Sequence, residues 1–215
     1  RGGVEADLTI TRLADDRYLV VTAAFTQTHV TAWISENIPT DAFCILTDVT
    51  GAYAMLNVQG PNSRALLSAI SNADFANESF RFGTMRNIEI GYQNAMAVRI
   101  SYTGELGYEL YIPTEMALPV YDQLISAGQE FGLKHCGYHT LNTLRIEKAY
   151  REWAHDMGPL ETLLEAGLGF TASWDKPSGF IGREALLEQK DAGPLKSRLV
   201  QFLLDDAEPV LTHNE

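Results

Sequence analysis

The spacing of apolar and polar residues predicts a chain that contains both strands and helices. Polar–apolar alternation or short apolar runs predict strands over residues 7–11, 18–22, 52–59, 85–90, 95–101, 107–112 and 197–204. Helical spacing predicts helices over residues 26–37, 63–70, 115–127, 137–153 and 180–186. Because strands and helices follow one another without regular alternation, the pattern predicts an α+β fold and not a doubly wound sheet.

Two residues qualify this pattern. Thr114 precedes the helix predicted from residue 115, and we expect its hydroxyl to accept a backbone N–H at the helix start. Arg145 shares a helix face with Leu141 and Ala149. A guanidinium on an apolar face predicts a side chain that is at least partly buried and paired.

Composition and charge limit the possible partners. The 215 residues carry a net charge of −12, with 46% hydrophobic residues. This charge repels nucleic acid and anionic membrane surfaces, so we expect neither as a partner. Cys44 and Cys136 lie among apolar or small residues and read as reduced core thiols in a reducing compartment. Because the chain opens at Arg1 without methionine, we expect it to be a piece of a longer polypeptide.

The segment over residues 101–109 carries the most informative chemistry. Its glycines permit a close approach of a flat ligand to the backbone. Strand alternation then places Glu109 and Tyr111 on one face and Leu110 on the other. A carboxylate beside an aromatic ring suits a planar heterocycle that donates two N–H groups, such as a pterin or a guanine-like ring. A hairpin turn with solvated glutamates is the alternative.

Other polar residues allow two interpretations each. Asp7 lies at the start of the first predicted strand. It is either a turn residue or a carboxylate that orients or deprotonates a substrate amine. His135 and His139 are four residues apart, but Gly137 between them favours a break, so no metal site is predicted.

Six segments in order carry a family resemblance: residues 2–8, 58–61, 102–109, 144–153, 164–168 and 180–186. Together they resemble the tetrahydrofolate-binding aminomethyltransferase family, whose founder is the T-protein of the glycine cleavage system. Within that family, the segment over residues 146–153 looks most like the C-terminal folate domain of dimethylglycine and sarcosine dehydrogenases or oxidases.

The resemblance implies an architecture and a reaction. Residues 1–155 would form a ferredoxin-like folate-binding domain, residues 156–195 a connecting segment, and residues 196–215 the start of a C-terminal β-barrel. Tetrahydrofolate would be the cofactor and would leave as 5,10-methylenetetrahydrofolate. FAD would bind only to a separate flavin domain of the same parent polypeptide, which would be the partner. The compartment would be bacterial cytoplasm or the mitochondrial matrix.

The resemblance also implies roles for individual residues. Asp7 would lie beside folate N5 and N10, Glu109 would hold the pterin, and Tyr102 would pack near it. Glu105 is an alternative for the pterin contact, and Phe170 corresponds to a position that is often aromatic near the folate. Where many members carry an arginine for the folate tail, this chain has Leu141.

Three functions are compatible with this resemblance. The first is a one-carbon transfer module of an amine dehydrogenase, which would follow a flavin-binding domain. The second is a free-standing aminomethyltransferase, or a folate-dependent methyltransferase or demethylase, with a shorter parent chain. The third is a non-catalytic folate-binding protein. The sequence upstream of Arg1 would discriminate between the first two.

Overall fold

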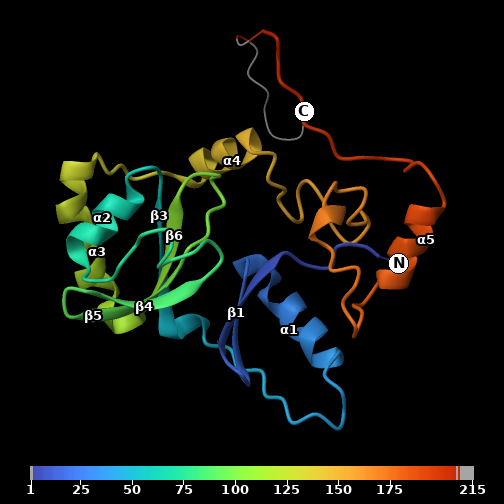
Figure 1. Cartoon of the computed structure of the whole chain (residues 1–215), viewed down its shortest axis with the longest axis horizontal. Helices are drawn as coiled ribbons and strands as arrows, with labels where there is room; N and C mark the ends of the chain where they lie inside the picture. The colour runs from blue at the N-terminus through green and yellow to red at the C-terminus, as the bar shows by residue number, and fades with distance from the viewer. Residues whose placement is uncertain (1, 207, 209–215) are drawn as a thin grey trace. The chain divides into compact units, whose positions relative to one another are not determined.

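The computed structural model describes residues 2–206 and 208, which fall into two compact units. One unit is the continuous segment Leu8–Tyr150. The other combines Arg1–Asp7 with Arg151–Glu215. The ribbon in Figure 1 is coloured along the chain, so that the blue N-terminal segment and the orange C-terminal elements of this second unit can be followed.

A four-stranded antiparallel sheet forms the centre of the unit Leu8–Tyr150. Its strands are β3 (Tyr53–Gln59), β4 (Met85–Ile90), β5 (Gln93–Val98) and β6 (Gly107–Pro113), in the order β3-β6-β5-β4. Helices α2 (Ser63–Ile70) and α3 (Ala117–Gly128) cover one face of this sheet (Figure 1). The core lies between that face and the helices.

Alternation along the strands explains which residues face the two helices. In β6, Tyr108, Leu110 and Ile112 are completely buried and join the core. Leu66 and Leu67 of α2 and Val120 and Leu124 of α3 pack in the same core. The intervening residues of each strand therefore point to the opposite face of the sheet.

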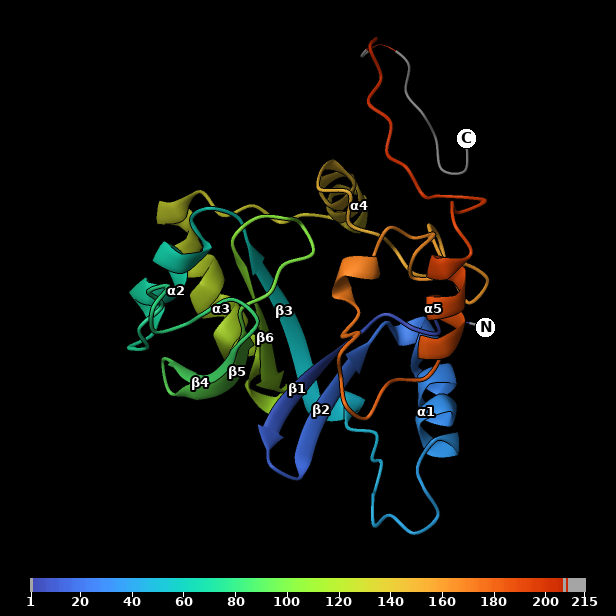
Figure 2. The ribbon, with the colours of Figure 1, turned by 45° about the vertical axis from the view of Figure 1, so that its right-hand side comes forward.

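The unit Leu8–Tyr150 also contains a hairpin of β1 (Leu8–Ala14) and β2 (Arg17–Thr22) and the helix α1 (Gln27–Glu36). Figure 2 shows the two hairpin strands side by side. A 3₁₀ turn, Thr50–Ala52, leads into β3. The last helix of the unit is α4 (Tyr138–Glu147).

In the second unit, the N-terminal segment is hydrogen-bonded to residues that follow the unit Leu8–Tyr150 in sequence. Val4 N donates to the Glu161 carbonyl at 3.0 Å, and the Trp153 indole N–H donates to the Val4 carbonyl at 2.7 Å. Helix α5 (Arg183–Asp191) is the longest element of this unit. No helix among the described residues is long and apolar enough to cross a membrane.

The predicted α+β mixture is confirmed, but the helix predicted over residues 137–153 is shorter. Helix α4 ends at Glu147 because the chain closes it with a Schellman motif, in which Tyr150 N donates to the Arg145 carbonyl and Ala149 N to the Ile146 carbonyl. Ala149 adopts a φ of 55°, in the left-handed region, and so ends the helical path.

Three further expectations were wrong. The Thr114 hydroxyl donates to the Gly51 carbonyl at 2.9 Å and makes no helix cap. Cys44 and Cys136 are exposed thiols and not core residues. The described residues 197–204 form no strand. Leu199 N donates to the Glu165 carbonyl at 2.9 Å, but a single backbone hydrogen bond of this kind does not make a strand, which needs a ladder of paired backbone groups.

Candidate functional site

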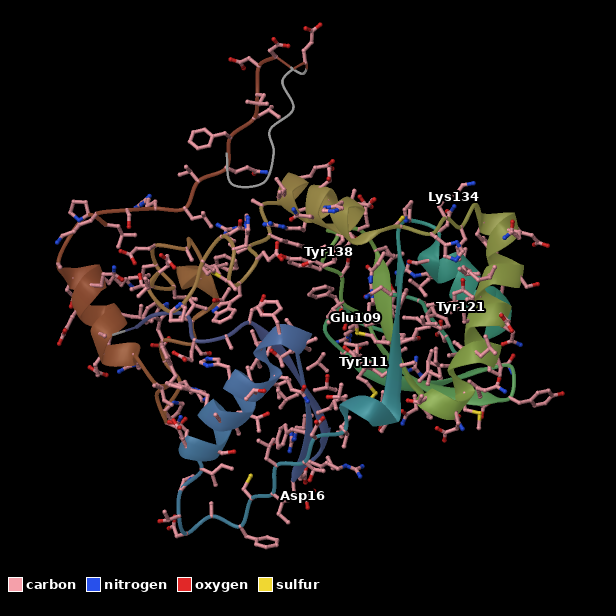
Figure 3. The ribbon with its side chains drawn as sticks, turned by 180° about the vertical axis from the view of Figure 1, so that it is seen from behind. Asp16, Glu109, Tyr111, Tyr121, Lys134 and Tyr138 are labelled. Carbon is pink, nitrogen blue, oxygen red and sulfur yellow. The ribbon has the colours of Figure 1, made fainter. Side chains whose placement is uncertain are left out.

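The candidate site lies on the face of the four-stranded sheet opposite α2 and α3. Strand β6 contributes Glu109 and Tyr111 to this face, and Figure 3 labels both side chains. The register of β3 against β6 places Asn57 directly opposite Glu109 and Met55 directly opposite Tyr111. Asn57 and Met55 are exposed, whereas Glu109 is half-buried and Tyr111 is buried. This face therefore presents polar groups and apolar surface together to a ligand.

Glu109 and Tyr111 form a hydrogen-bonded pair. The Tyr111 hydroxyl donates to Glu109 Oε2 at 2.5 Å. Burial raises the pKa of Glu109, and the hydrogen bond from Tyr111 partly offsets this rise. Burial and the nearby carboxylate both raise the pKa of Tyr111, so this hydroxyl keeps its proton and remains a donor. One carboxylate oxygen, Oε1, makes no hydrogen bond in the part of the chain that the structure describes.

The glycines of the preceding turn are required by the local geometry. Gly104 has a φ of 75°, and a Cβ placed on it would lie 2.0 Å from Cγ of Lys148. A Cβ on Gly107 would lie 1.8 Å from Oε1 of Gln59. These two positions therefore admit only glycine without displacing a neighbour.

Tyr102 lies at the start of this turn and contacts another aromatic residue. Its ring stacks on Tyr150 with a centroid distance of 6.2 Å and an interplanar angle of 18°. Tyr150 is partly exposed, so the stacked pair offers a flat apolar surface. Glu105 is exposed and points away from the sheet core, in keeping with a turn residue. Tyr102, Glu105 and Glu109 all belong to the unit Leu8–Tyr150.

Asp7 and Phe170 belong to the other compact unit. Asp7 is exposed, yet desolvation by the atoms around it raises its pKa. It makes no hydrogen bond or ion pair with the described residues. Phe170 lies in the 3₁₀ turn Gly169–Thr171 and is 84% exposed, so it is not a core residue. The predicted cooperation of Asp7 with Glu109 stays a prediction.

Arg145 is hydrogen-bonded to its own helix and to the turn that follows it, so it does not replace the arginine that many family members use for the folate tail. It is 2% exposed, its Nε donates to Asn142 Oδ1 at 2.6 Å, and its Nη1 donates to the Tyr150 carbonyl at 3.0 Å. The expectation that Arg145 is buried and paired is confirmed. Leu141, half-buried on the same helix, provides no charge.

Sequence reasoning missed two residues of the site face, Asn57 and Gln59. Gln59 Nε2 donates to Asn57 Oδ1 at 3.3 Å and to the Tyr108 carbonyl at 3.5 Å. The signal was present in the alternation of β3, where polar Asn57 and Gln59 flank the buried Val58. Among the described residues, no group of three His, Cys, Asp or Glu side chains could hold a metal ion.

The arrangement can recognise a flat, polar ring by its edge. Glu109 accepts hydrogen bonds, and a carboxylate has about four lone-pair sites, of which Tyr111 uses one. Exposed Met55 provides apolar surface two residues from Asn57. A ring that carries adjacent N–H groups at its edge is therefore complementary to this face.

Comparisons with known proteins identify the family of the chain. Residues 1–176 match the family model described as the GCVT N-terminal domain. The chain is 46% identical over its whole length to 4-methylaminobutanoate oxidase (formaldehyde-forming) from Paenarthrobacter nicotinovorans. It is 39% identical, over 98% of its length, to the mitochondrial sarcosine dehydrogenase of Homo sapiens. It spans 26% and 24% of these two proteins.

A solved structure extends the likeness to the fold. The crystal structure of glycine cleavage system aminomethyltransferase T from Bartonella henselae aligns with a TM-score of 0.75 and 25% sequence identity. The alignment covers 90% of this chain and 51% of that chain. The chain therefore belongs to the family of the GCVT N-terminal domain and is an aminomethyltransferase-like domain related to the sarcosine dehydrogenases.

Proposed function

We propose that this chain is the one-carbon transfer module of an amine dehydrogenase or oxidase, in which tetrahydrofolate captures a methylene group as 5,10-methylenetetrahydrofolate. The observation that carries the proposal is the half-buried Glu109 on the face of the sheet opposite α2 and α3, with one carboxylate oxygen that makes no hydrogen bond to the described residues. The family membership of residues 1–176 supports it.

The residues present fit the pterin end of a folate. A pterin edge offers a ring N–H and an exocyclic amine side by side, and one carboxylate can accept both. Burial of Glu109 raises its pKa, so binding two donors would compensate a carboxylate that is poorly solvated without a ligand. The stacked pair of Tyr102 and Tyr150 would supply aromatic surface near the ring.

Asp7 is proposed to act on the amine that receives the one-carbon unit. Bound tetrahydrofolate would supply the two nitrogens, N5 and N10, between which the methylene group is held. Asp7, with its raised pKa, would orient these amines and accept a proton as the first nitrogen attacks. A carboxylate whose pKa is raised towards the working pH is a better proton acceptor than an ordinary one.

The rest of the assignment concerns the parent protein. The chain spans about a quarter of the two amine-oxidising relatives, which supports a longer parent polypeptide with a separate FAD domain as its partner. We propose residues 1–155 as the folate domain, 156–195 as the connection and 196–215 as the start of a barrel. One of these relatives is named as mitochondrial and the other is from the bacterium Paenarthrobacter nicotinovorans, so we propose the mitochondrial matrix or bacterial cytoplasm as the compartment.

One relative favours a second product. The 46% identical oxidase is named as formaldehyde-forming. By analogy, water instead of the folate amine would take up the one-carbon unit, and formaldehyde would be released. The two products can coexist, because hydrolysis would proceed whenever the folate site is empty.

Calorimetry with 5-formyltetrahydrofolate tests the proposed site. We expect the full-length protein to bind this ligand and Glu109→Gln to weaken binding by about 10- to 100-fold, since a neutral amide replaces a charge-assisted acceptor. Glu89→Gln is the matched control, because Glu89 is an exposed glutamate on strand β4 of the same sheet. Equal losses in both variants would rule out Glu109 as the pterin residue.

A tracer experiment tests the role of Asp7. The full-length protein would oxidise N-methyl amines with a ¹³C-labelled methyl group in the presence of tetrahydrofolate. Asp7→Asn should shift the label from 5,10-methylenetetrahydrofolate to formaldehyde while leaving flavin reduction unchanged. If flavin reduction and label transfer fall together, Asp7 has no specific role in capture.

A further inference from the structure

Asn57 is the one polar side chain that the sheet register places directly opposite Glu109. The Cα atoms of Asn57 and Glu109 are partners in the β3–β6 ladder, and both side chains lie on the face opposite α2 and α3. Cβ atoms of directly opposed residues are about 4.5–5.5 Å apart. Both side chains therefore reach the same edge of one small ring.

The hydrogen bonds around Gln59 fix which end of the Asn57 amide faces outward. The Tyr108 carbonyl can only accept, so the Gln59 group that faces it at 3.5 Å must be the NH₂. The same Nε2 lies 3.3 Å from Asn57, and this second contact requires the oxygen of Asn57. Reversing the Gln59 amide would set two oxygens against each other at the Tyr108 carbonyl.

The outward group of Asn57 is therefore its NH₂. Within the described part of the chain, Asn57 Nδ2 donates no hydrogen bond. Gly107 maintains this arrangement, because a Cβ at that position would lie 1.8 Å from Gln59 Oε1 and displace the side chain that orients Asn57. The face thus presents an acceptor, the Glu109 carboxylate, next to a donor, the Asn57 amide.

This order of acceptor and donor matches only one class of ring edge. A 2-amino-4-oxo pyrimidine edge offers an amine and a ring N–H to the acceptor and a carbonyl oxygen to the donor. A 2,4-diamino edge offers an amine where the carbonyl would be, and this amine would face the Asn57 NH₂ without an acceptor. Its ring N3 also carries no proton, so this edge offers one donor fewer to Glu109. Two donors that face each other leave both unpaired, which disfavours binding.

We propose that Asn57 is a specificity-determining residue that donates to the 4-oxo group of the ring held by Glu109. This inference rests on the proposed function, since it assigns an additional contact at the same site. Asn57 selects the 4-oxo ring over its 4-amino counterpart, and Gln59 acts on the ligand only by orienting Asn57.

Calorimetry with a matched pair of ligands tests the inference on the full-length protein. The ligands are 5-formyltetrahydrofolate and its 4-amino-4-deoxy counterpart, which differ at the group that Asn57 is proposed to contact and at the adjacent ring N3, which carries a proton only in the 4-oxo ring. We expect the protein to bind the 4-oxo ligand about tenfold more tightly than the 4-amino ligand. Asn57→Ala should reduce this ratio several-fold, mainly by weakening the 4-oxo ligand, and the discrimination that remains would come from the ring N–H that only the 4-oxo ligand offers to Glu109.

Two further variants test whether the change in ratio comes specifically from the loss of the Asn57 donor. Asn57→Asp replaces the donor by an acceptor and should reverse the preference in favour of the 4-amino ligand. Asn94→Ala is the control, and it should leave the ratio unchanged. Asn94 is an exposed asparagine on β5, four residues from Val98, and Val98 is the partner of Glu109 in that strand. Urea unfolding confirms that each variant is folded.

The outcomes separate this inference from the proposed function. If the protein binds both ligands with equal affinity, or if Asn57→Ala keeps the tenfold ratio, the role of Asn57 is refuted and the folate site stands. If the protein binds neither ligand, the proposed function fails and the inference fails with it.

Discussion

Strand β6 contains two tyrosines, of which one has a hydrogen-bonded hydroxyl group and the other has a hydroxyl group without a partner among the described residues. This difference predicts opposite effects of a Tyr→Phe substitution on stability. Tyr111 donates its hydrogen bond to Glu109 Oε2. Tyr108 is completely buried in the core, and its hydroxyl has no hydrogen-bond partner among the described residues. Tyr111→Phe should destabilise the protein, whereas Tyr108→Phe should stabilise it.

The structure sets the size of each effect. A hydrogen bond to a charged group contributes about 1.5–3 kcal/mol. Glu109 is only half-buried, so water can replace part of this bond, and we expect Tyr111→Phe to cost about 1–2 kcal/mol at neutral pH. An unsatisfied buried hydroxyl costs about 1–3 kcal/mol. Removal of the Tyr108 hydroxyl should recover about 1 kcal/mol, since the ring and its contacts with Phe75 and Phe80 remain.

Urea unfolding at several pH values measures both effects. The Tyr111 bond is charge-assisted only while Glu109 is ionised. The cost of Tyr111→Phe should therefore shrink as the pH falls through the raised pKa of Glu109, whereas the gain from Tyr108→Phe should not depend on pH. A pH-independent cost of Tyr111→Phe, or a loss of stability in Tyr108→Phe, would refute this reading of the strand.

Three other substitutions test the framework of the site by urea unfolding. Glu109→Gln should remove part of the pH dependence of the free energy of unfolding. Burial raises the pKa of Glu109 in the folded state, so between the folded and unfolded pKa values the folded protein binds more protons than the unfolded chain. The free energy of unfolding of the parent protein therefore falls as the pH rises through this range. The variant should therefore gain stability at neutral pH, and a loss there would contradict the assignment of burial as the cause. Gly104→Ala should cost about 1–2 kcal/mol, because φ is 75° and the new Cβ meets the Lys148 stem; an unchanged midpoint would show that the turn can relax. Leu110→Ala should cost about 2–5 kcal/mol, since Leu110 is completely buried beneath the site, and a smaller loss would mean that the core is loosely packed there.

Much of the fold could be predicted from alternation along the chain. The period of two in residues 107–112 placed Glu109 and Tyr111 on one face, and the hydrogen bond between them confirms it. The strand predicted over 85–90 and the helix over 63–70 have the predicted bounds. These elements are set by local spacing, which a sequence shows directly.

Features that depend on tertiary contacts could not be predicted. The end of α4 depends on the left-handed backbone conformation of Ala149, which alanine rarely adopts and which its residue type therefore does not predict. The Thr114 hydroxyl donates to the carbonyl of Gly51, which is 63 residues away in sequence, and does not bond to the start of the helix that follows it. The role of Asn57 required the β3–β6 register, which pairs it with Glu109 across a gap of 52 residues.

A crystal structure of the full-length protein with bound 5-formyltetrahydrofolate tests the central claim most directly. The account predicts that the pterin lies on the face of the sheet opposite α2 and α3, with its ring N–H and exocyclic amine about 2.7–2.9 Å from the Glu109 carboxylate. A pterin bound elsewhere, with Glu109 still bonded only to Tyr111, would contradict it.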